Sequence, residues 1–221
     1  MNDEGFLASL TEAERTALAT IGRRRDFPAG QILFTEGDDG HEVFVLLGGQ
    51  VKVVTTAPSG RDVILDVMDQ DSLLGELSAI DGNPRSATAI ALTPVTVLYI
   101  STEDFLAFLE QNGPAATTLL RLVAARLRRS SQRQLEFGTS DALGRLCTCL
   151  LTMLDRYGTG ENHHRRVTMP LAQHEIAAMT GLSREAVVKG LRALRSLDWI
   201  DTQAREVMIL DEEAMRARAA G

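Results

Sequence analysis

The chain has 221 residues, of which 44% are hydrophobic and 24% are charged, and its formal net charge is −7. These proportions are ordinary for a soluble globular protein, and the length suits one large domain or two small ones. No run approaches the roughly 18 apolar residues of a membrane span, and the acidic N-terminus lacks the apolar segment of a secretory signal. We therefore expect a cytoplasmic protein with no membrane partner.

The charge is divided unevenly along the chain. Residues 1–112 hold 7 Lys+Arg and 18 Asp+Glu, a net charge of −11, whereas residues 113–221 hold 16 and 12, a net charge of +4. An acidic first half and a basic second half indicate two domains with different partners. The overall acidity therefore does not exclude binding of nucleic acid by the second half.

Residues that commonly bind metals are few. Cys147 and Cys149 lie two apart in an apolar run with a helical pattern, so they point to different faces and a disulfide between them is disfavoured. Two thiols are too few for a protein-ligated iron–sulfur cluster, and we interpret them as buried structural cysteines. His163 and His164 have no complementary cluster of ligands, so we read them as exposed loop residues and expect no metal.

The first predicted helix is short and amphipathic and begins near residue 11. Thr11 and Glu14 have the spacing of a capping box. We expect this helix to end near three consecutive arginines, Arg23, Arg24 and Arg25, because cations suit a helix C-terminus. The basic run is interpreted as a solvated face rather than a nucleic-acid patch.

Between residues 27 and 100 the hydrophobic pattern changes to short β-rich runs. Clusters of Gly, Pro, Asp and Ser separate these runs and mark turns. The runs cover residues 32–34, 43–46, 51–54, 63–65 and 95–98. Many short strands at regular spacing predict an antiparallel sandwich or jelly roll.

One stretch interrupts the predicted strands and has the groups that a cyclic phosphodiester with a ribose requires. Arg85 offers a forked donor for a phosphate, and Ser86 and nearby backbone N–H groups add neutral donors. Glu76 accepts hydrogen bonds and suits a sugar hydroxyl, while Gly75 lets the backbone of Gly75 and Leu77 come close. The alternative is a solvated turn with one surface ion pair. The order Gly-Glu-Leu at 75–77 and Arg-Ser-Ala at 85–87 resembles the phosphate-binding cassette of cyclic-nucleotide-binding domains.

A long helix is predicted from Pro114 to about residue 137. Seven positions of this helix follow one another in alternating steps of four and three residues. This spacing is a heptad seam, and it predicts a parallel dimer through the helix. These positions are Ala116, Leu120, Val123, Leu127, Ser130, Gln134 and Phe137. The alternative is a single helix packed on its own domain. Ser130 is a polar residue on the seam, and it costs stability unless it finds a partner.

The remaining chain has the spacing of a helix–turn–helix. Asp141 is a predicted N-cap, residues 173–179 form a short helix, Gly181 lies in the turn, and Ser183 caps a second helix. Val187, Leu191 and Leu194 form the inward stripe of that second helix. Residues 199–201 and 207–210 are predicted strands of a wing, and the tail after residue 211 is charged and helix-prone.

The outward side chains of the second helix are Arg184, Glu185 and Lys189. Arg and Lys side chains pair with guanine and Glu accepts from cytosine, so this face suits the major groove of DNA. The alternative is a surface helix with a Glu185–Lys189 pair at positions i and i+4. The sequence Gly-Leu-Ser-Arg-Glu-Ala-Val at 181–187 resembles the recognition motif of the CRP/FNR family of bacterial transcription regulators.

This resemblance extends from about residue 5 to residue 210 and implies an α+β architecture. Residues 1–113 are expected to form a cyclic-nucleotide-binding β-roll of jelly-roll type, 114–138 a dimerisation helix and hinge, and 139–221 a winged helix–turn–helix. The implied ligand is cAMP, with Arg85 and Ser86 on the phosphate and with Glu76 and the backbone of Gly75 and Leu77 on the ribose. Ser130 and Ser131 stand where the family has a hydroxyl pair that reaches the base.

The implied partners are a second copy of the chain, a palindromic DNA operator and RNA polymerase. Arg184, Glu185 and Lys189 would read a half-site, and Gln173 and His174 could contact phosphates. The resemblance also implies that the nucleotide reorients the recognition helices of the homodimer. They would then lie about one DNA turn, roughly 34 Å, apart.

Two departures from the family pattern affect specificity. Ser130 replaces the threonine of the best-known cAMP responders, which leaves selection between adenine and guanine open. Lys189 replaces an arginine of many relatives and loses the bidentate fork.

The main alternatives to a cAMP response are cGMP, another effector, or constitutive DNA binding. The few cysteines argue against the iron–sulfur sensors of the family, and the intact cassette argues against its haem sensors. A phosphodiesterase would need a metal cluster or an activated nucleophile, which the cassette lacks, so we expect no enzymatic activity.

Overall fold

The computed structural model describes residues 5–58, 60–159, 165–168, 171–203 and 206–220. The chain divides into two compact units, Met1–Arg128 and Arg129–Gly221. His163 and His164 lie outside the described residues. Within the described residues, no helix is long and apolar enough to cross a membrane, and no three His, Cys, Asp or Glu side chains group as metal ligands would.

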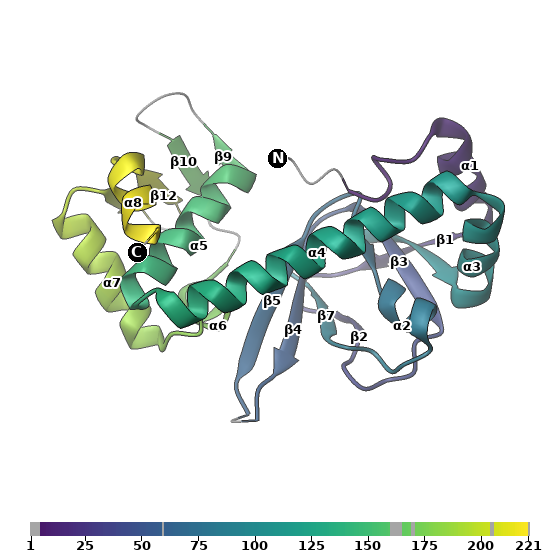
Figure 1. Ribbon diagram of the computed structural model, residues 1–221, viewed down its shortest axis with the longest axis horizontal. Coiled ribbons are helices and arrows are strands. Elements are labelled where there is room, and N and C mark those ends of the chain that lie inside the picture. The colour runs from purple at the N-terminus through teal and green to yellow at the C-terminus, as the bar shows by residue number, and fades with distance from the viewer. Residues whose placement is uncertain (1–4, 59, 160–164, 169–170, 204–205, 221) are drawn as a thin grey trace. The chain divides into compact units, whose positions relative to one another are not determined.

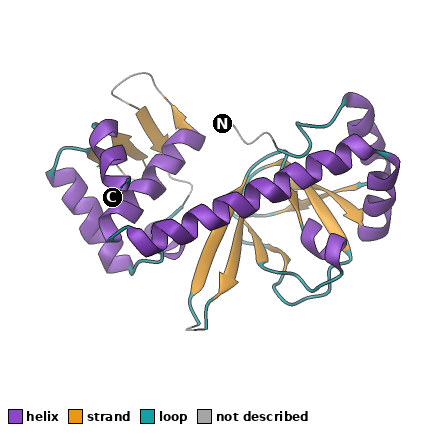
Figure 2. Cartoon of the chain, viewed as in Figure 1, coloured by secondary structure: helices purple, strands orange, loops and turns teal. Residues whose placement is uncertain are grey.

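Two four-stranded antiparallel sheets form the first unit over its described residues (Figures 1 and 2). The first sheet has the order β1 (Arg23–Phe27), β8 (Val95–Ser101), β3 (Glu42–Gly48) and β6 (Leu73–Leu74). The second has the order β2 (Ile32–Phe34), β7 (Thr88–Ala91), β4 (Val51–Thr56) and β5 (Asp62–Met68). The five predicted strands are present, and the predicted β-roll is confirmed.

Strand β3 is buried on both faces because successive side chains point to opposite sides of a strand. Val43 and Val45 pack in a cluster with the helices of the first unit. Phe44 and Leu46 pack in a second cluster, between the two sheets. This two-sided burial explains why residues 43–46 form an unbroken apolar run instead of an alternating one.

Three helices cover the outer face of the first sheet: α1 (Glu12–Ile21), α3 (Thr102–Gln111) and the start of α4 (Gly113–Thr139). The capping box of α1 is confirmed, because Thr11 N donates to Glu14 Oε2 at 2.8 Å and Glu14 N donates to Thr11 Oγ1 at 3.3 Å. Leu119 of α4 is buried in the same cluster as Phe105 of α3. The beginning of α4 is therefore part of the core of the first unit.

The first helix ends beside the three arginines, as predicted, but the arginines themselves lie in a strand. Arg23, Arg24 and Arg25 do not end a helix but form most of β1, an edge strand paired antiparallel with β8. All three side chains are exposed, and charged residues on an edge strand discourage pairing with another sheet. Helix α1 ends before them because the chain at Gly22 is already extended, with φ −92° and ψ 160°.

The second unit combines four helices with a small sheet of order β11–β12–β10–β9 over its described residues. These elements are α5 (Ala142–Tyr157), β9 (Gly158–Thr159), β10 (Arg165–Thr168), α6 (Gln173–Thr180), α7 (Arg184–Ser196), β11 (Ile200–Gln203), β12 (Glu206–Ile209) and α8 (Glu212–Ala219). Leu146 and Leu150 of α5 are fully buried, as are Val187 and Leu194 of α7. The predicted helix–turn–helix and its wing are confirmed.

The two cysteines are free and buried in α5, as predicted. Burial disfavours the thiolate and raises the pKa of Cys147 to about 11 and that of Cys149 to about 12. Neither thiol is reactive at neutral pH, because the thiolate is the nucleophile.

We expect the N-cap of α5 to make the stability of the second unit depend on pH. Asp141 accepts from Gly144 N at 2.9 Å and pairs with Arg218 of α8, and both contacts lower the pKa of Asp141. A carboxylate with a lowered pKa stabilises the fold above its unfolded value, near 4, and loses that effect as the pH falls through the folded pKa. Asp141→Asn should lower the Tm by about 2–4 °C at pH 7.

This difference in Tm between the wild type and Asp141→Asn should shrink between pH 5 and pH 3, as scanning calorimetry would show. Glu206→Gln removes one charge from an exposed strand position of β12 and serves as the control. If the difference in Tm stayed constant down to pH 3, the charge of Asp141 would contribute nothing to stability.

Candidate functional site

The candidate cassette is a short helix, α2 (Glu76–Asp81), held between strands of the two sheets. Before α2, β6 pairs with Phe44 and Val45 of β3, and after it the chain returns into β7. Gly75 and Gly82 flank α2 with φ of +78° and +70°, in the left-handed region that favours glycine. Strand pairing before α2 and the backbone conformation of the two glycines therefore determine where this helix begins and ends.

Arg85 lies at the end of the cassette and is only 2% exposed. Its Nη1 donates to the carbonyl oxygen of Gly75 at 3.0 Å. Its Nη2 donates to the carbonyl oxygen of Glu42 at 2.7 Å and to Glu42 Oε2 at 3.1 Å. The hydroxyl of Tyr99 donates to Glu42 Oε1 at 3.0 Å. Strands β3 and β8 thus hold the guanidinium from one side.

Aromatic rings form the other part of the surroundings of Arg85. The Cζ atom of Arg85 lies 4.4 Å from the ring centroid of Phe34 and 6.0 Å from that of Phe44. A guanidinium over an aromatic face is stabilised by the ring quadrupole. Burial lowers the pKa of Arg85 and Glu42 opposes that shift, but the pKa of an arginine is so high that the side chain stays charged.

The Nε atom of Arg85 is buried, and none of the described residues accepts a hydrogen bond from it. A buried donor without an acceptor costs free energy, and each such group calls for an explanation. Both Nη atoms have acceptors, so the Nε–H is the donor of the guanidinium that lacks one among the described residues.

Glu76, the first residue of α2, is 3% exposed. Its Oε1 pairs with Arg126 Nη1 of α4, and Arg126 Nη2 also donates to the carbonyl oxygen of Leu73 at 2.7 Å. Arg126 therefore ties α4 to both β6 and α2 within the first unit. Sequence reasoning missed Arg126, although it precedes Ser130 by four residues and so lies on the same face of the helix.

Two seam positions of α4 expose large apolar side chains. Leu120 is 70% exposed and Leu127 is 67% exposed, and the two are seven residues apart. Leu119 is buried, so α4 has one apolar side in the core of the first unit and a second that is largely exposed among the described residues. Ser130 and Ser131 follow on the same helix and are exposed.

The helix–turn–helix is built from α6 and α7. Gly181 ends α6 with φ +65°, and Leu182 N donates to the carbonyl oxygen of Ala177 at 3.1 Å. Ser183 caps α7 by accepting from Ala186 N at 3.1 Å. The buried stripe of α7 is the predicted one: Val187, Leu191 and Leu194.

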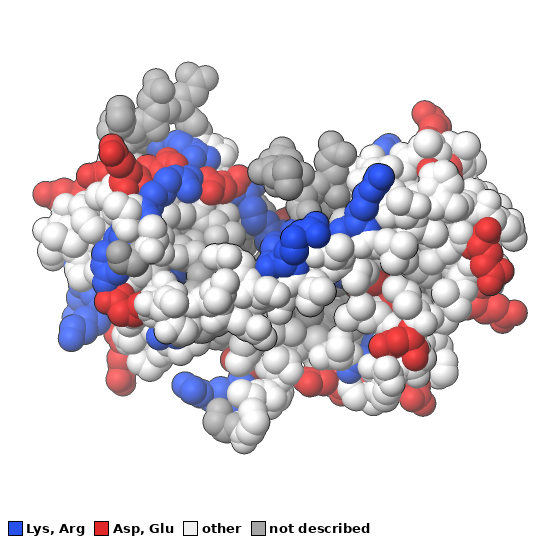
Figure 3. Space-filling view, viewed as in Figure 1, with Lys and Arg blue, Asp and Glu red and all other residues white. Residues whose placement is uncertain are grey.

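The predicted DNA-contacting side chains are exposed in the second unit. They are Arg184, Glu185 and Lys189 of α7, and Gln173 and His174 of α6. On the face drawn in Figure 3, acidic side chains line the outer edge of the first unit, whereas Lys and Arg gather over α4 and mix with acids on the second unit. This distribution follows the charge division of the sequence.

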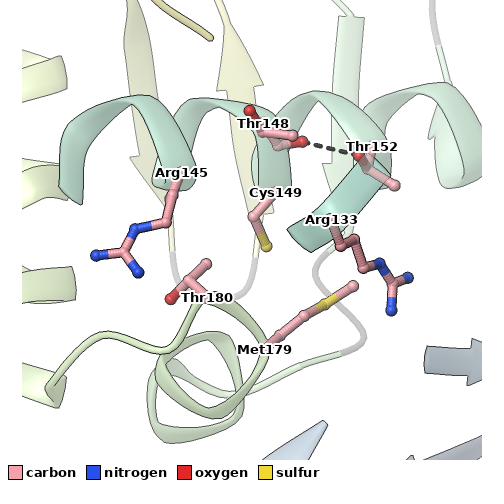
Figure 4. A pocket seen from close by; sticks show the side chains of 7 residues that line it. All are labelled: Arg133, Arg145, Thr148, Cys149, Thr152, Met179 and Thr180. Carbon is pink, nitrogen blue, oxygen red and sulfur yellow. Dashed lines mark hydrogen bonds between the residues drawn. The ribbon is translucent and has the colours of Figure 1, made fainter. Parts of the chain in front are cut away.

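The second unit also contains a cavity of about 70 Å³ beside the helix–turn–helix (Figure 4). Its lining residues are Arg133, Arg145, Thr148, Cys149, Thr152, Met179 and Thr180. Each threonine hydroxyl donates to the backbone carbonyl four residues earlier in its own helix, as Thr152 does to Thr148 at 2.8 Å. Figure 4 shows the two arginines pointing away from each other, so these side chains do not converge on a ligand.

Replacing each of the two cassette glycines by alanine should distinguish the cost of backbone strain from the cost of a steric clash with Arg85. A Cβ on Gly75 would lie 2.3 Å from Arg85 Nη1, whereas a Cβ on Gly82 would meet nothing within 4 Å. Both alanines would pay about 1–2 kcal/mol for a positive φ. Gly75→Ala should lose about 1–3 kcal/mol more, because Arg85 is buried and pinned by three hydrogen bonds.

Denaturant unfolding of Gly75→Ala and Gly82→Ala measures this difference. Equal losses in the two variants would show that Arg85 can move away at no cost, and that the close approach at Gly75 is unimportant.

Comparison with known protein families gives two matches that divide the chain. A model described as a cyclic nucleotide-binding domain matches residues 24–112, and one described as a Crp-like helix-turn-helix domain matches residues 144–218. The first range contains the cassette with Gly75, Glu76 and Arg85. The second contains α5 to α8 and the exposed residues of α7.

Relatives and solved structures match over nearly the whole chain. The CRP-like cAMP-activated global transcriptional regulator of Mycobacterium tuberculosis is 34% identical over 93% of each chain. The cyclic AMP receptor protein of Thermus thermophilus is 30% identical over 87% of this chain and 88% of its own.

Among solved structures, a CooA mutant from Carboxydothermus hydrogenoformans aligns with a TM-score of 0.84 at 18% identity, over 99% of this chain and 97% of its own. The c-di-GMP responsive regulator CLP of Xanthomonas campestris aligns with a TM-score of 0.78 at 17% identity, over 90% and 99%. These two similarities concern the fold alone. By its domains and its relatives, the chain belongs to the CRP/FNR family of cyclic-nucleotide-binding, DNA-binding transcription regulators.

Proposed function

We propose that this regulator responds to cAMP, and that nucleotide binding at the cassette changes its affinity for DNA. One observation carries the proposal: Arg85 is a buried cation whose Nε–H has no acceptor among the described residues. A buried arginine with an unpartnered donor suits a phosphate, which accepts charge-assisted hydrogen bonds from the guanidinium edge. Ser86, the next residue, is exposed and adds a hydroxyl.

Glu76 and its neighbours supply the ribose half of the proposed site. The ion pair with Arg126 engages Oε1 of Glu76, and a carboxylate has further acceptor positions. A ribose hydroxyl is the donor that such an acceptor selects, with the backbone of Gly75 and Leu77 beside it. A cyclic nucleotide carries one phosphate charge and one free ribose hydroxyl, and it matches this arrangement.

The base is assigned to Ser130 and Ser131. A serine hydroxyl both donates and accepts, so this pair by itself fits adenine or guanine. The Mycobacterium tuberculosis and Thermus thermophilus relatives are named for cAMP, which favours adenine. cGMP is the alternative ligand.

A second copy of the chain completes the proposed assembly. The spacing of Leu120 and Leu127 is one heptad, and both are about two-thirds exposed on the single chain. A parallel pairing of two α4 helices covers both leucines and places Ser130 and Ser131 near the partner. Residues 114–138 then act as the dimerisation helix and hinge.

The DNA-contacting face is assigned to α7. Arg184 and Lys189 would pair with guanine and Glu185 would accept from cytosine in the major groove, while Gln173 and His174 would contact phosphates. A homodimer presents two such helices to a palindromic operator. A transcription regulator of this kind also requires RNA polymerase as a partner.

A different outcome is constitutive DNA binding, with the pocket responding to another effector or to none. The observation that favours it is the pairing of Arg85 with Glu42, which already supplies the guanidinium with a carboxylate. Under this alternative, operator affinity is equal with and without nucleotide. The fold also accommodates other ligands, since the structural neighbour CLP is described as c-di-GMP responsive.

Titration of the purified protein with cAMP and cGMP by calorimetry tests the ligand. We expect saturable binding of cAMP, and Arg85→Ala should weaken it by about 100-fold or more because a charge-assisted contact to the phosphate is lost. Arg85→Lys keeps the positive charge but not the two-pronged guanidinium, so its cAMP affinity should lie between those of the wild type and Arg85→Ala. Arg121→Ala, which removes an exposed arginine of α4, is the control.

Circular dichroism of each variant shows whether it is folded. Ser86→Ala, at an exposed position, tests the same phosphate contact with little risk to the fold. If neither nucleotide binds to the wild type, the ligand half of the proposal is rejected, and constitutive DNA binding becomes the better account.

Selection from a randomised duplex DNA library, with and without cAMP, tests the DNA half and the dimer. We expect enriched sites to be palindromic, with half-sites about one turn apart, and enrichment to depend on cAMP. Arg184→Ala should relax the preference at one base position by about 1–3 kcal/mol, whereas His174→Ala should weaken all sequences alike. Enrichment of single, asymmetric sites would contradict the dimer.

A further inference from the structure

We propose that Glu42 is an internal counter-charge of Arg85 that lowers the affinity of the site for the nucleotide phosphate. The inference rests on the nucleotide-binding function proposed above and concerns how that site is tuned. Glu42 lies at the start of β3, 43 residues before Arg85 in the sequence, and its Oε2 accepts from Arg85 Nη2 at 3.1 Å.

The carboxylate of Glu42 is held in place by strand geometry. Tyr99 of β8 stands opposite Phe44 in the β3–β8 register and donates its hydroxyl to Glu42 Oε1 at 3.0 Å. Each carboxylate oxygen therefore has a donor, one from Tyr99 and one from Arg85. The burial of the Tyr99 hydroxyl and its bond to Glu42 raise the pKa of Tyr99, so the hydroxyl remains a donor at neutral pH.

The two members of the ion pair differ in exposure. The side chain of Arg85 is 1% exposed, whereas that of Glu42 is 30% exposed. Glu42 thus lies on the solvent side of the guanidinium, where its negative charge would repel a bound anion. Asp38 and Glu76 also act on Arg85 through space, but of the three acids only Glu42 contacts the guanidinium through its side chain.

The Glu42 carboxylate has opposite effects on the empty and the occupied site. In the empty site it stabilises a buried cation, which would otherwise be costly. In the occupied site it places a second negative charge within a few ångströms of the phosphate, on the same guanidinium. The carbonyl oxygens of Gly75 and Glu42, which also accept from Arg85, keep the guanidinium beside Glu42, so the repulsion persists in the complex.

Glu42→Gln isolates the charge from the shape. The glutamine keeps the side-chain length and one carbonyl oxygen that can accept from Arg85 or Tyr99, but it carries no charge. The backbone carbonyl of residue 42, which accepts from Arg85 Nη2 at 2.7 Å, is unchanged. The position of Arg85 is therefore retained while the counter-charge is removed.

The experiment measures cAMP affinity by calorimetry and the Tm of the ligand-free protein in the full chain. We expect Glu42→Gln to bind cAMP about 3- to 10-fold more tightly than the wild type, from the loss of repulsion between two charges several ångströms apart near a surface. We expect its ligand-free Tm to fall. Asp62→Asn removes one negative charge from an exposed position of β5 and should change neither quantity.

A rise in cAMP affinity together with a fall in ligand-free Tm distinguishes this role from a purely structural one. If Glu42→Gln lowers both affinity and Tm, then Glu42 positions Arg85 for the phosphate and the proposal is wrong. Equal affinity of variant and wild type would also overturn it. If cAMP and cGMP bind to neither protein, the proposed function fails instead, and the fall in ligand-free Tm still reports on the Glu42–Arg85 pair alone.

Discussion

A buried guanidinium needs acceptors, and the arrangement around Arg85 follows from that need. The carbonyl groups of Gly75 and Glu42 and the carboxylate of Glu42 accept from it, and Phe34 provides an aromatic face. The absence of a side chain at Gly75 creates the space for the guanidinium, since a Cβ there would overlap Nη1. Strands β2, β3 and β8 and the cassette are thus joined through one side chain. A change at any of them would alter the proposed phosphate site.

A second ion pair connects the cassette to the long helix. Arg126 holds Glu76 of α2 and the carbonyl oxygen of Leu73, so it fixes α4 against the end of β6. A ribose hydroxyl that bonds to Glu76 shares this carboxylate with Arg126. Ser130 lies one helical turn after Arg126, so under the proposed function the ribose and the base would contact consecutive turns of α4.

Local patterns predicted most of the fold. Short β-rich runs identified β2, β3, β4, β5 and β8, and the capping residues Thr11, Asp141 and Ser183 gave three helix starts correctly. The strand at 23–27 was not predicted, because an edge strand with three arginines has no apolar alternation. Glu42 and Arg126 were missed for another reason: each meets its cassette partner across 43 or 50 residues, and no local pattern records such a contact. Charged pairs that close a site become visible only when the strands and helices are assembled.

The ion pairs of the site suggest where its selectivity arises. A phosphate that binds Arg85 joins a cation already neutralised by Glu42, so the net electrostatic gain is smaller than for a free guanidinium in the same pocket. Under the proposed function, the phosphate then contributes orientation more than affinity. cAMP and cGMP share the phosphate and the ribose, so a counter-charge at Arg85 lowers the affinity for both alike. Discrimination between the two nucleotides must then come from the base, at the proposed contacts with Ser130 and Ser131.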